Sequence, residues 1–391
     1  MATAHLPDMA RIAEATRALD PPFAVVDRTA LETNTADLVR RAGGVPIRVA
    51  SKSVRVRQVI EETLARDGFA GVMSYSLAES NWLADCGVDD ILLAYPTADT
   101  AALHDLVAKE HRTAAITVMV DDVAQLDLID AGVGAGHPPI RVCIDVDASL
   151  RIGRLHVGVR RSPIRTPEEA AALARVVARR AGFELVGVMF YDAQIAGLPD
   201  SSALIRRLKR RSAAELLERR GSIVDAVRRV APVTLVNAGG TGSLEVTGAD
   251  DSVTELTAGS GLFNPGLFDG YDSFTGQAAA MFALSVVRKP TPDIATLFSG
   301  GYIASGQTSR TRQPKPVWPR GLKLIGTEGA GEVQTPVRGD TARRLRIGDR
   351  VWMRHAKAGE MCERFDTVAL VGADGRVELV PTYRGEGKNY G

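Results

Sequence analysis

The sequence predicts an α/β protein, built as a (β/α)₈ barrel of the TIM type followed by a C-terminal all-β domain. Three observations support this fold class. Eight short β-branched runs alternate with segments of helical periodicity, polar residues follow each run, and after about residue 275 the helical segments give way to β-rich segments broken by Gly and Pro. Near-continuous apolar strands that alternate with helices are typical of a parallel sheet covered by helices.

The expected elements divide the chain into an N-terminal extension (1–22), a barrel domain (23–275) and a β-domain (276–391). The strand expected at 23–27 belongs either to the barrel or to the second domain. The barrel strands are expected at 45–52, 71–76, 90–96, 116–121, 140–147, 185–192, 234–240 and 254–261. The β-domain strands are expected at 281–287, 293–298, 322–325, 331–335, 349–353 and 367–371, and a long exposed loop at 305–321.

Composition argues against several classes of protein. The 48 Lys+Arg and 47 Asp+Glu residues leave a net charge of +1, so no overall field favours nucleic acid or an anionic membrane. The basic run at 206–211 is interpreted as a solvated helix face. Three separated cysteines, Cys86, Cys143 and Cys362, are typical of reduced thiols, and Cys143 is expected in the core. With no signal-peptide pattern and no membrane span, the expectation is a cytoplasmic protein.

Lys52 ends the first expected barrel strand and is flanked by Ser51 and Ser53. Taken alone, such a lysine is usually a solvated residue at a strand end. It becomes a candidate functional residue because barrels of this kind place their active sites at the carboxyl ends of the strands.

Two glycine-rich turns follow the last two expected barrel strands. The first contains Asn237, Gly239, Gly240 and Thr241, and the second contains Gly259 and Ser260. A single glycine-rich turn is usually only a tight turn. Two of them on adjacent late strands favour phosphate binding, because bare backbone N–H groups and hydroxyls can surround a phosphate there.

A lysine on the first strand and a phosphate site on the last two suggest pyridoxal 5′-phosphate, held by its phosphate and bonded to Lys52. At this point the sequence resembles a known family, the fold-type III pyridoxal phosphate enzymes with an alanine-racemase-like barrel. It is most similar to the branch of D-threonine aldolase, D-serine dehydratase and the amino acid deaminase/aldolases. The resemblance covers nearly the whole chain and rests on Lys52, on Tyr191 within 188–197, on the Gly239–Thr241 turn, on 255–261 and on a C-terminal His/Cys segment.

The resemblance implies a role for each matching residue. Lys52 would bind the cofactor covalently, and Tyr191 would lie beside it. The remaining cofactor-binding residues would be Gln194, Asn237, Gly239, Gly240, Thr241, Gly259 and Ser260. The family also places an arginine near the cofactor ring after an Ile-Asp pair. Arg151 is assigned to that role, but Arg154 and His156 are alternatives that spacing does not exclude.

In the same branch, the second domain brings a divalent cation to the site through a closely spaced His-x-Cys or His-x-Asp pair. Here His355 is followed by Glu360 and Cys362 instead. These three residues are the candidate metal ligands. A thiolate with an imidazole favours zinc, whereas a carboxylate also accepts manganese.

The resemblance implies a pyridoxal phosphate-dependent lyase that cleaves a small-molecule substrate, a β-hydroxy-D-amino acid, to glycine and an aldehyde. The close alternative is a dehydratase, which deaminates D-serine or D-threonine to a 2-oxo acid and ammonia. An amino-acid racemase and a non-catalytic pyridoxal phosphate carrier are further alternatives. The resemblance also implies a homodimer.

Overall fold

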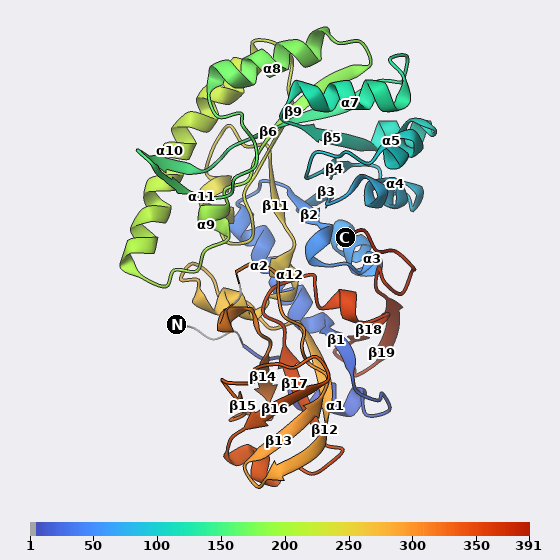
Figure 1. Ribbon diagram of the computed structural model, residues 1–391, viewed down its shortest axis with the longest axis vertical. Coiled ribbons are helices and arrows are strands. Elements are labelled where there is room, and N and C mark those ends of the chain that lie inside the picture. Colours follow the sequence, from blue (N-terminus) through green and yellow to red (C-terminus); the bar gives the residue numbers. More distant parts are fainter. Residues whose placement is uncertain (1–4, 308) are drawn as a thin grey trace. The chain divides into compact units, whose positions relative to one another are not determined.

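The computed structural model describes residues 5–307 and 309–391. Its contacts divide the chain into two units, which are drawn together in Figure 1. The barrel unit comprises Leu38–Lys52, Glu62–Ala258 and Tyr390–Gly391, and the β-rich unit comprises the residues up to Asp37, Ser53–Glu61 and Gly259–Asn389.

The barrel unit contains a closed barrel of eight parallel strands, as predicted. The last strand pairs with the first, so that the strand order is β2-β3-β4-β5-β6-β9-β10-β11. The strands are β2 (Ile47–Ala50), β3 (Phe69–Ser74), β4 (Ile91–Leu93), β5 (Ile116–Val120), β6 (Ile140–Val146), β9 (Phe183–Phe190), β10 (Leu235–Ala238) and β11 (Glu255–Ala258). Each of them overlaps one of the eight predicted runs.

Helices cover the outside of this barrel, and the long helices α8 and α10 pack against each other (Figure 1). The helices are α4 (Leu77–Asp85), α5 (Thr100–Val107), α6 (Glu110–Ala115), α7 (Val123–Val133), α8 (Pro167–Arg179), α9 (Ala193–Ala196), α10 (Ala203–Arg228) and α11 (Leu244–Gly248). Capping boxes begin α7 at Asp122 and α8 at Thr166, where the side chains satisfy otherwise unpaired backbone N–H groups. Helices α2 (Arg28–Ala42) and α3 (Arg57–Leu64) contribute residues to both units.

Apolar side chains fill the inside of the barrel. Leu92, Met119, Cys143 and Met189 form a buried cluster there, with one residue from each of four neighbouring strands. Side chains alternate between the two faces of a strand. The residue two positions after each member of this cluster therefore points to the same face as that member, nearer the carboxyl end of its strand. Those residues include Asp121, Asp145 and Tyr191, so the chemical groups lie directly above an apolar layer.

A buried ion-pair network links the first and last barrel strands at the opposite end. Arg48 on β2 donates two hydrogen bonds of 2.7 Å to Glu255 on β11 and one of 2.9 Å to Asp90. Asn237 on β10 also donates to Glu255, at 2.7 Å. Arg48 is only 2% exposed, so its charge is stabilised by these partners rather than by water.

A two-stranded hairpin follows β6 and was not predicted. Its strands are β7 (Leu150–Ile152) and β8 (Leu155–Val157), which pair antiparallel. The hairpin contains Arg151, Arg154 and His156, the three candidates for the cofactor-proximal position.

The β-rich unit contains a nine-stranded sheet. Its strands are β1 (Phe23–Asp27), β12 (Ala280–Thr291), β13 (Ile294–Phe298), β14 (Lys315–Trp318), β15 (Lys323–Leu324), β16 (Gln334–Arg338), β17 (Arg350–Arg354), β18 (Thr367–Val371) and β19 (Val377–Pro381). Strand β1 pairs antiparallel with β12 and parallel with β18. The unit also holds α1 (Met9–Ala15), α12 (Ser260–Phe263) and the 3₁₀ turns η2 (Gly266–Gly270), η3 (Arg310–Arg312), η4 (Asp340–Arg344) and η5 (Cys362–Arg364). A further 3₁₀ turn, η1 (Ser51–Ser53), has its first two residues in the barrel unit.

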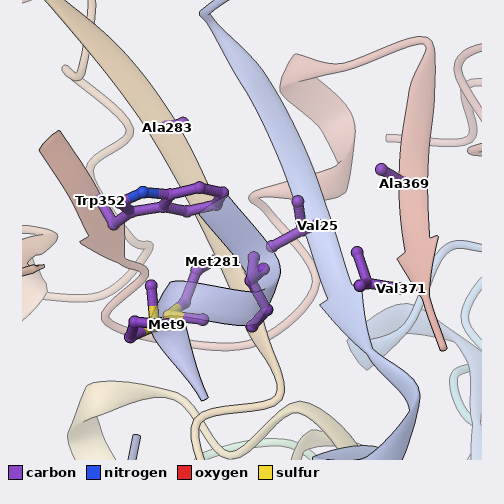
Figure 2. Packing of buried hydrophobic residues seen from close by; sticks show 8 residues of the cluster. Met9, Val25, Met281, Ala283, Trp352, Ala369 and Val371 are labelled. Carbon is purple, nitrogen blue, oxygen red and sulfur yellow. The ribbon is translucent and has the colours of Figure 1, made fainter. Parts of the chain in front are cut away.

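Helix α1 packs onto this sheet through an apolar cluster, which Figure 2 shows from close by. The indole ring of Trp352 lies near the side chains of Met9 and Met281, and Val25 comes from β1. The ring of Phe23 meets the indole edge-on, with ring centroids 5.6 Å apart. Much of the predicted N-terminal extension is therefore part of this core, whereas its first four residues lie outside the described ones.

Two features of the β-rich unit differ from the sequence prediction. The predicted loop at 305–321 contains β14, which pairs with β17. Residues 259–275, which the sequence analysis placed in the barrel domain, group with the β-rich unit. The reason is local hydrogen bonding: Asn34 donates to the carbonyls of Leu262 and Gln277, and Arg354 donates to that of Asn264. Of the helices within the described residues, none is long and apolar enough to cross a membrane.

We expect Arg48→Met to lower the free energy of unfolding by about 3–5 kcal/mol, because it leaves the carboxylate of Glu255 buried without its main partner. The double variant Arg48→Met/Glu255→Leu removes both charges and should recover part of this loss. Urea unfolding followed by circular dichroism measures both. The exposed Arg207→Gln on α10 is the control, and an equal effect of Arg48→Met and Arg207→Gln would contradict the prediction.

Candidate active site

Lys52 lies directly after β2, in the short turn η1. Its exposed ammonium donates a 3.0 Å hydrogen bond to the hydroxyl of Tyr95, which follows β4. The strand before it is anchored by the buried side chains of Ile47 and Val49. A rigid apolar strand therefore presents one amine at the carboxyl end of the barrel, where active sites of this fold are found.

Arg161 lies against the aromatic rings of both Tyr95 and Tyr191. Its guanidinium carbon is 5.2 Å from the centre of the Tyr95 ring and 5.0 Å from that of Tyr191, within the range of cation–π attraction. Burial raises the pKa of Tyr191 and the charge of Arg161 opposes this, so the hydroxyl is neutral and can donate a hydrogen bond. The sequence analysis assigned no role to Arg161 or to Tyr95, although Tyr95 stands at the polar end of an expected barrel strand.

Two buried carboxyl groups lie at the carboxyl ends of neighbouring strands: Asp121 directly follows β5, and Asp145 is the last residue but one of β6. Burial is the main cause that raises the pKa of Asp145 to about 7, with Asp121 and Asp147 acting in the same direction and Arg161 against it. Burial also raises the pKa of Asp121. Asp145 therefore changes its protonation near neutral pH, which is where proton-transfer groups are useful.

The glycine turn after β10 has the open backbone that an anion site requires. Gly239 has φ +82°, a conformation that favours glycine. A Cβ added to Gly240 would lie 2.8 Å from the Cβ of Ala196 and 3.8 Å from the ring of Tyr191. Gly240 therefore has no side chain where Ala196 packs against it, and its N–H donates to Ser243. The rest of the turn, with Thr241, stays the predicted phosphate site.

Asp192 supports this turn from beneath. It is fully buried and accepts hydrogen bonds from the hydroxyls of Ser243, at 3.1 Å, and Thr247, at 2.8 Å. Ser243 in turn accepts a 3.2 Å bond from the backbone N–H of Gly240. Burial raises the pKa of Asp192, opposed first by the charge of Arg220. The sequence analysis did not identify this residue.

The second predicted phosphate turn belongs to the β-rich unit. Gly259 directly follows β11, and Ser260 begins the four-residue helix α12. Their assignment to the cofactor stays a prediction.

Gln194 and Asn237, two other predicted cofactor residues, are buried and bonded within the protein. Gln194 donates to the Ala148 carbonyl at 2.6 Å and to the Ser212 hydroxyl at 2.8 Å. The amide of Asn237 donates to Glu255 in the network described above and to the Thr257 hydroxyl at 2.8 Å. These bonds support the barrel strands and the nearby loop rather than leave donors for a ligand.

Three residues were considered for the position near the cofactor ring: Arg151, Arg154 and His156. Among the described residues, none of the three makes an ion pair, hydrogen bond or ring contact with Tyr191. Arg151 is 47% exposed and donates a 2.6 Å bond to Asp147. His156 lies beside the Val159 carbonyl, at 3.0 Å. Arg161, a few residues further along, makes the contact with Tyr191 instead.

The predicted metal ligands do not come together as one group. No cluster of three or more His, Cys, Asp or Glu side chains suited to a metal occurs among residues 5–307 and 309–391. Glu360 accepts hydrogen bonds from the backbone N–H of Ser305, at 2.9 and 3.1 Å, and the ammonium of Lys357 donates to the Ser305 hydroxyl at 3.0 Å. The carboxylate of Glu360 thus already accepts hydrogen bonds from Ser305, to which Lys357 also donates. His355, Glu360 and Cys362 do not form a set of three ligands.

His355 and Cys362 are buried in the β-rich unit. Burial, with Arg354 adding to it, lowers the pKa of His355 to about 3, so the ring is neutral. Neither ring nitrogen makes a well-formed hydrogen bond, although the backbone of Ala280 lies close enough to oppose the pKa shift slightly. The ring packs edge-on against Phe263, with centroids 6.5 Å apart. A zinc site usually has at least three protein ligands, and His355 with Cys362 would supply only two.

Residues 26–263 match the model of the alanine racemase N-terminal domain, which spans the barrel and its lysine. The chain belongs to the alanine racemase N-terminal domain family. Among curated proteins, it is 24% identical over 257 residues to 3-hydroxy-D-aspartate aldolase of Paracoccus denitrificans, covering 63% of this chain and 60% of that protein. The match therefore spans less than two thirds of the relative's length.

Several solved structures share the fold of this chain over nearly its whole length. D-threonine aldolase of Filomicrobium marinum matches with a TM-score of 0.78 and 19% identity, covering 94% of this chain and 95% of that one. D-threo-3-hydroxyaspartate dehydratase of Delftia sp. matches with a TM-score of 0.73 and 22% identity, covering 93% and 97%. Both comparisons extend the likeness to the β-rich unit.

The residues of this chain fit pyridoxal phosphate, the cofactor expected for the alanine racemase-like family. Three features match its chemistry: an exposed amine at Lys52, a neutral aromatic hydroxyl at Tyr191, and a glycine turn at 239–241 in which Gly239 has φ +82°. All three lie in the barrel unit. Lys52 would hold the cofactor covalently and the turn would hold its phosphate.

We expect Asp192→Ala to raise the dissociation constant for pyridoxal phosphate about tenfold, because Ser243 and Thr247 lose their acceptor and the turn loosens. Absorbance titration of the apoenzyme measures the constant. Binding of pyridoxal, which lacks the phosphate, should change much less, and Asp251→Ala is the matched carboxylate control. The milder Asp192→Asn serves if the alanine variant is unstable. Equal weakening of both ligands would contradict a role in phosphate binding.

Asp145 should make the stability of the protein depend on pH. Its pKa rises from 3.8 to about 7 on folding, so the stability that its protonated form contributes is present below pH 3.8 and lost as pH rises through 7. Between pH 5 and pH 8 we expect the wild type to lose about 2–3 kcal/mol more than Asp145→Asn. Urea unfolding at the two pH values measures this, and parallel pH profiles would contradict it.

Proposed function

We propose that this protein is a pyridoxal phosphate-dependent lyase that cleaves the Cα–Cβ bond of β-hydroxy-D-amino acids, giving glycine and an aldehyde. One observation carries the proposal: within the barrel unit, contacts run from Lys52 through Tyr95 and Arg161 to Tyr191, and the ring of Tyr191 lies 3.8 Å from where a Cβ on Gly240 would stand. The likeness to two aldolases supports the choice of reaction.

The bound cofactor would supply an electron-withdrawing ring that accepts the electron pair of the broken bond. The protein's own groups bind, orient and move protons. The turn at 239–241 fixes one end of the ligand, and Tyr191 lies beside it. Arg161, held against two aromatic rings, offers its N–H groups to a substrate carboxylate.

The hydrogen bond between the Lys52 Nζ and the Tyr95 Oη provides a path for protons. Bond cleavage requires the β-hydroxyl proton to leave, and glycine forms when Cα receives a proton. An amine and a phenol 3.0 Å apart can accept the first and return the second. Asp145, with its pKa near 7, is a further proton-holding group at this end of the barrel.

The second candidate function is dehydration to a 2-oxo acid and ammonia. The same Lys52–Tyr95 pair supports it, because an amine that removes the Cα proton instead would lead to loss of the hydroxyl. The likeness to a dehydratase also supports this alternative. Neither reaction is derived through a metal, since the proposed ligand set does not fit one.

Borohydride reduction of the holoenzyme should fix the cofactor on the Lys52 peptide, as read by mass spectrometry. We expect Lys52→Ala to abolish this label and to lower the cleavage of D-threonine about 10²-fold or more, because both the anchor and the proton carrier are lost. Exposed Lys323→Ala is the control and should keep both.

The products distinguish the candidates. Glycine and acetaldehyde from D-threonine support the aldolase, 2-oxobutyrate and ammonia support the dehydratase, and D-threonine whose only change is loss of chirality at Cα indicates a racemase. If Lys52 is labelled but no β-hydroxy-D-amino acid reacts, the result indicates a non-catalytic cofactor carrier. We further propose a homodimer, on the family resemblance alone, and a cytoplasmic location, on the sequence pattern described above.

A further inference from the structure

Arg41, to which the proposed function gives no role, has a fully buried side chain in the last turn of α2, within the barrel unit. Its Nε donates a 2.5 Å hydrogen bond to one carboxylate oxygen of Glu245, and a terminal nitrogen donates a 2.9 Å bond to the other oxygen. The same terminal nitrogen donates a 2.7 Å bond to the backbone carbonyl of Thr241. A cation that has lost its water depends on such partners, so these bonds hold the guanidinium in one place.

Both partners of Arg41 lie in or just after the glycine turn at 239–241. Thr241 is the last residue of the turn, and Glu245 is in helix α11. The side chain of Glu245 is 37% exposed, so water partly screens the ion pair. The bond to the Thr241 carbonyl is buried, and water does not compete for it. This bond is therefore the contact through which Arg41 constrains the turn most directly.

The bond to the Thr241 carbonyl also fixes the direction of the next N–H group in the chain. The peptide between Thr241 and Gly242 is trans. In a trans peptide, the C=O and N–H bonds lie in one plane and point in opposite directions. Because the carbonyl of Thr241 points toward Arg41, the N–H of Gly242 points away from it.

The N–H of Gly242 is a donor that is left for an anion. Gly242 is buried, yet in the part of the chain that the structure describes its N–H donates to no backbone or side-chain acceptor. The N–H of Gly240, by contrast, already donates to Ser243. Buried backbone N–H groups almost always have a partner, which is protein, water or a ligand. The unpaired N–H directly after the turn therefore indicates where an acceptor binds.

We propose that Arg41 is a positioning residue for the cofactor phosphate: it holds the Thr241 carbonyl, so that the N–H of Gly242 faces the anion. Arg41 acts through the turn, because its buried guanidinium is engaged by Glu245 and Thr241. This inference rests on the proposed function, and specifically on pyridoxal phosphate as the cofactor.

Arg41→Lys tests the inference, because lysine keeps the charge but lacks the planar fork that reaches Thr241 and both oxygens of Glu245 at once. We expect this variant to raise the dissociation constant of the full-length apoenzyme for pyridoxal phosphate about tenfold. The constant for pyridoxal, which lacks the phosphate, should change much less. Absorbance titration measures both constants. Arg40→Lys, at the exposed neighbouring position of α2, is the matched control and should bind both ligands like the wild type.

Glu245→Gln separates the two contacts of Arg41. Glutamine keeps an oxygen that accepts from the guanidinium and leaves the bond to Thr241 in place. We therefore expect the dissociation constant for pyridoxal phosphate to change about threefold or less. A change as large as that of Arg41→Lys would show that the ion pair acts on the site rather than the Thr241 carbonyl, and would overturn the inference.

The amide of Gly242 provides a measurement on the wild type that needs no stable Arg41 variant. Labelling threonine with ¹³C at the carbonyl and glycine with ¹⁵N selects the Thr–Gly pairs, which in this chain are 241–242, 247–248 and 275–276. Gly242→Ala removes one signal and so assigns it. We expect pyridoxal phosphate to shift the Gly242 amide proton more than pyridoxal does, with Gly248 as the reference. Equal shifts with the two ligands would contradict the inference.

The outcomes separate this inference from the proposed function. If the wild type binds pyridoxal phosphate and Lys52 is labelled, but Arg41→Lys binds both ligands like the wild type or weakens both equally, only the inference fails. If Arg41→Lys does not fold, the amide shift of Gly242 in the wild type decides. If the wild type does not bind pyridoxal phosphate, the proposed function fails and this inference fails with it.

Discussion

The closure of the barrel by Arg48 and Glu255 is the constraint on which the candidate site depends. These residues join the first and last strands with two charge-assisted hydrogen bonds in a buried setting. Lys52 follows Arg48 by an even number of residues, and the register of β2 against β11 is fixed at Thr257 and Arg48. A slip of one residue would turn every side chain of the strand to its other face. The ion pair at one end of the strand thus helps to set where the amine emerges at the other.

The barrel was predictable because its signal is local and repeated. Each strand is a short, mostly apolar run, and each is followed by a polar carboxyl end. Lys52 and the glycine turn at 239–241 were found because they stand at such ends. The β-rich unit was less predictable: β14 lies within a segment rich in Gly, Arg and Pro, and its pairing with β17 is a long-range contact that no local pattern reveals.

The candidate site was predicted only in part, for a related reason. Arg161 lies beyond an unpredicted hairpin, and only the folded chain brings it against Tyr95 and Tyr191. Asn237 matched a ligand-binding motif, but the structure engages it in the barrel network instead. The three predicted ligands at 355–362 do not form one cluster among the described residues, and the backbone N–H of Ser305 donates to Glu360. Residue type and spacing do not predict which hydrogen-bond partner a polar side chain has in the folded chain.

The pairing of β1 has a consequence for how the protein is made. Its neighbours β12 and β18 are encoded far downstream, so the first strand of the chain waits, without partners, through the synthesis of every barrel strand. The barrel strands need no such delay, because consecutive strands mostly pair with each other. The nine-stranded sheet can therefore be completed around β1 only after β18 has been made.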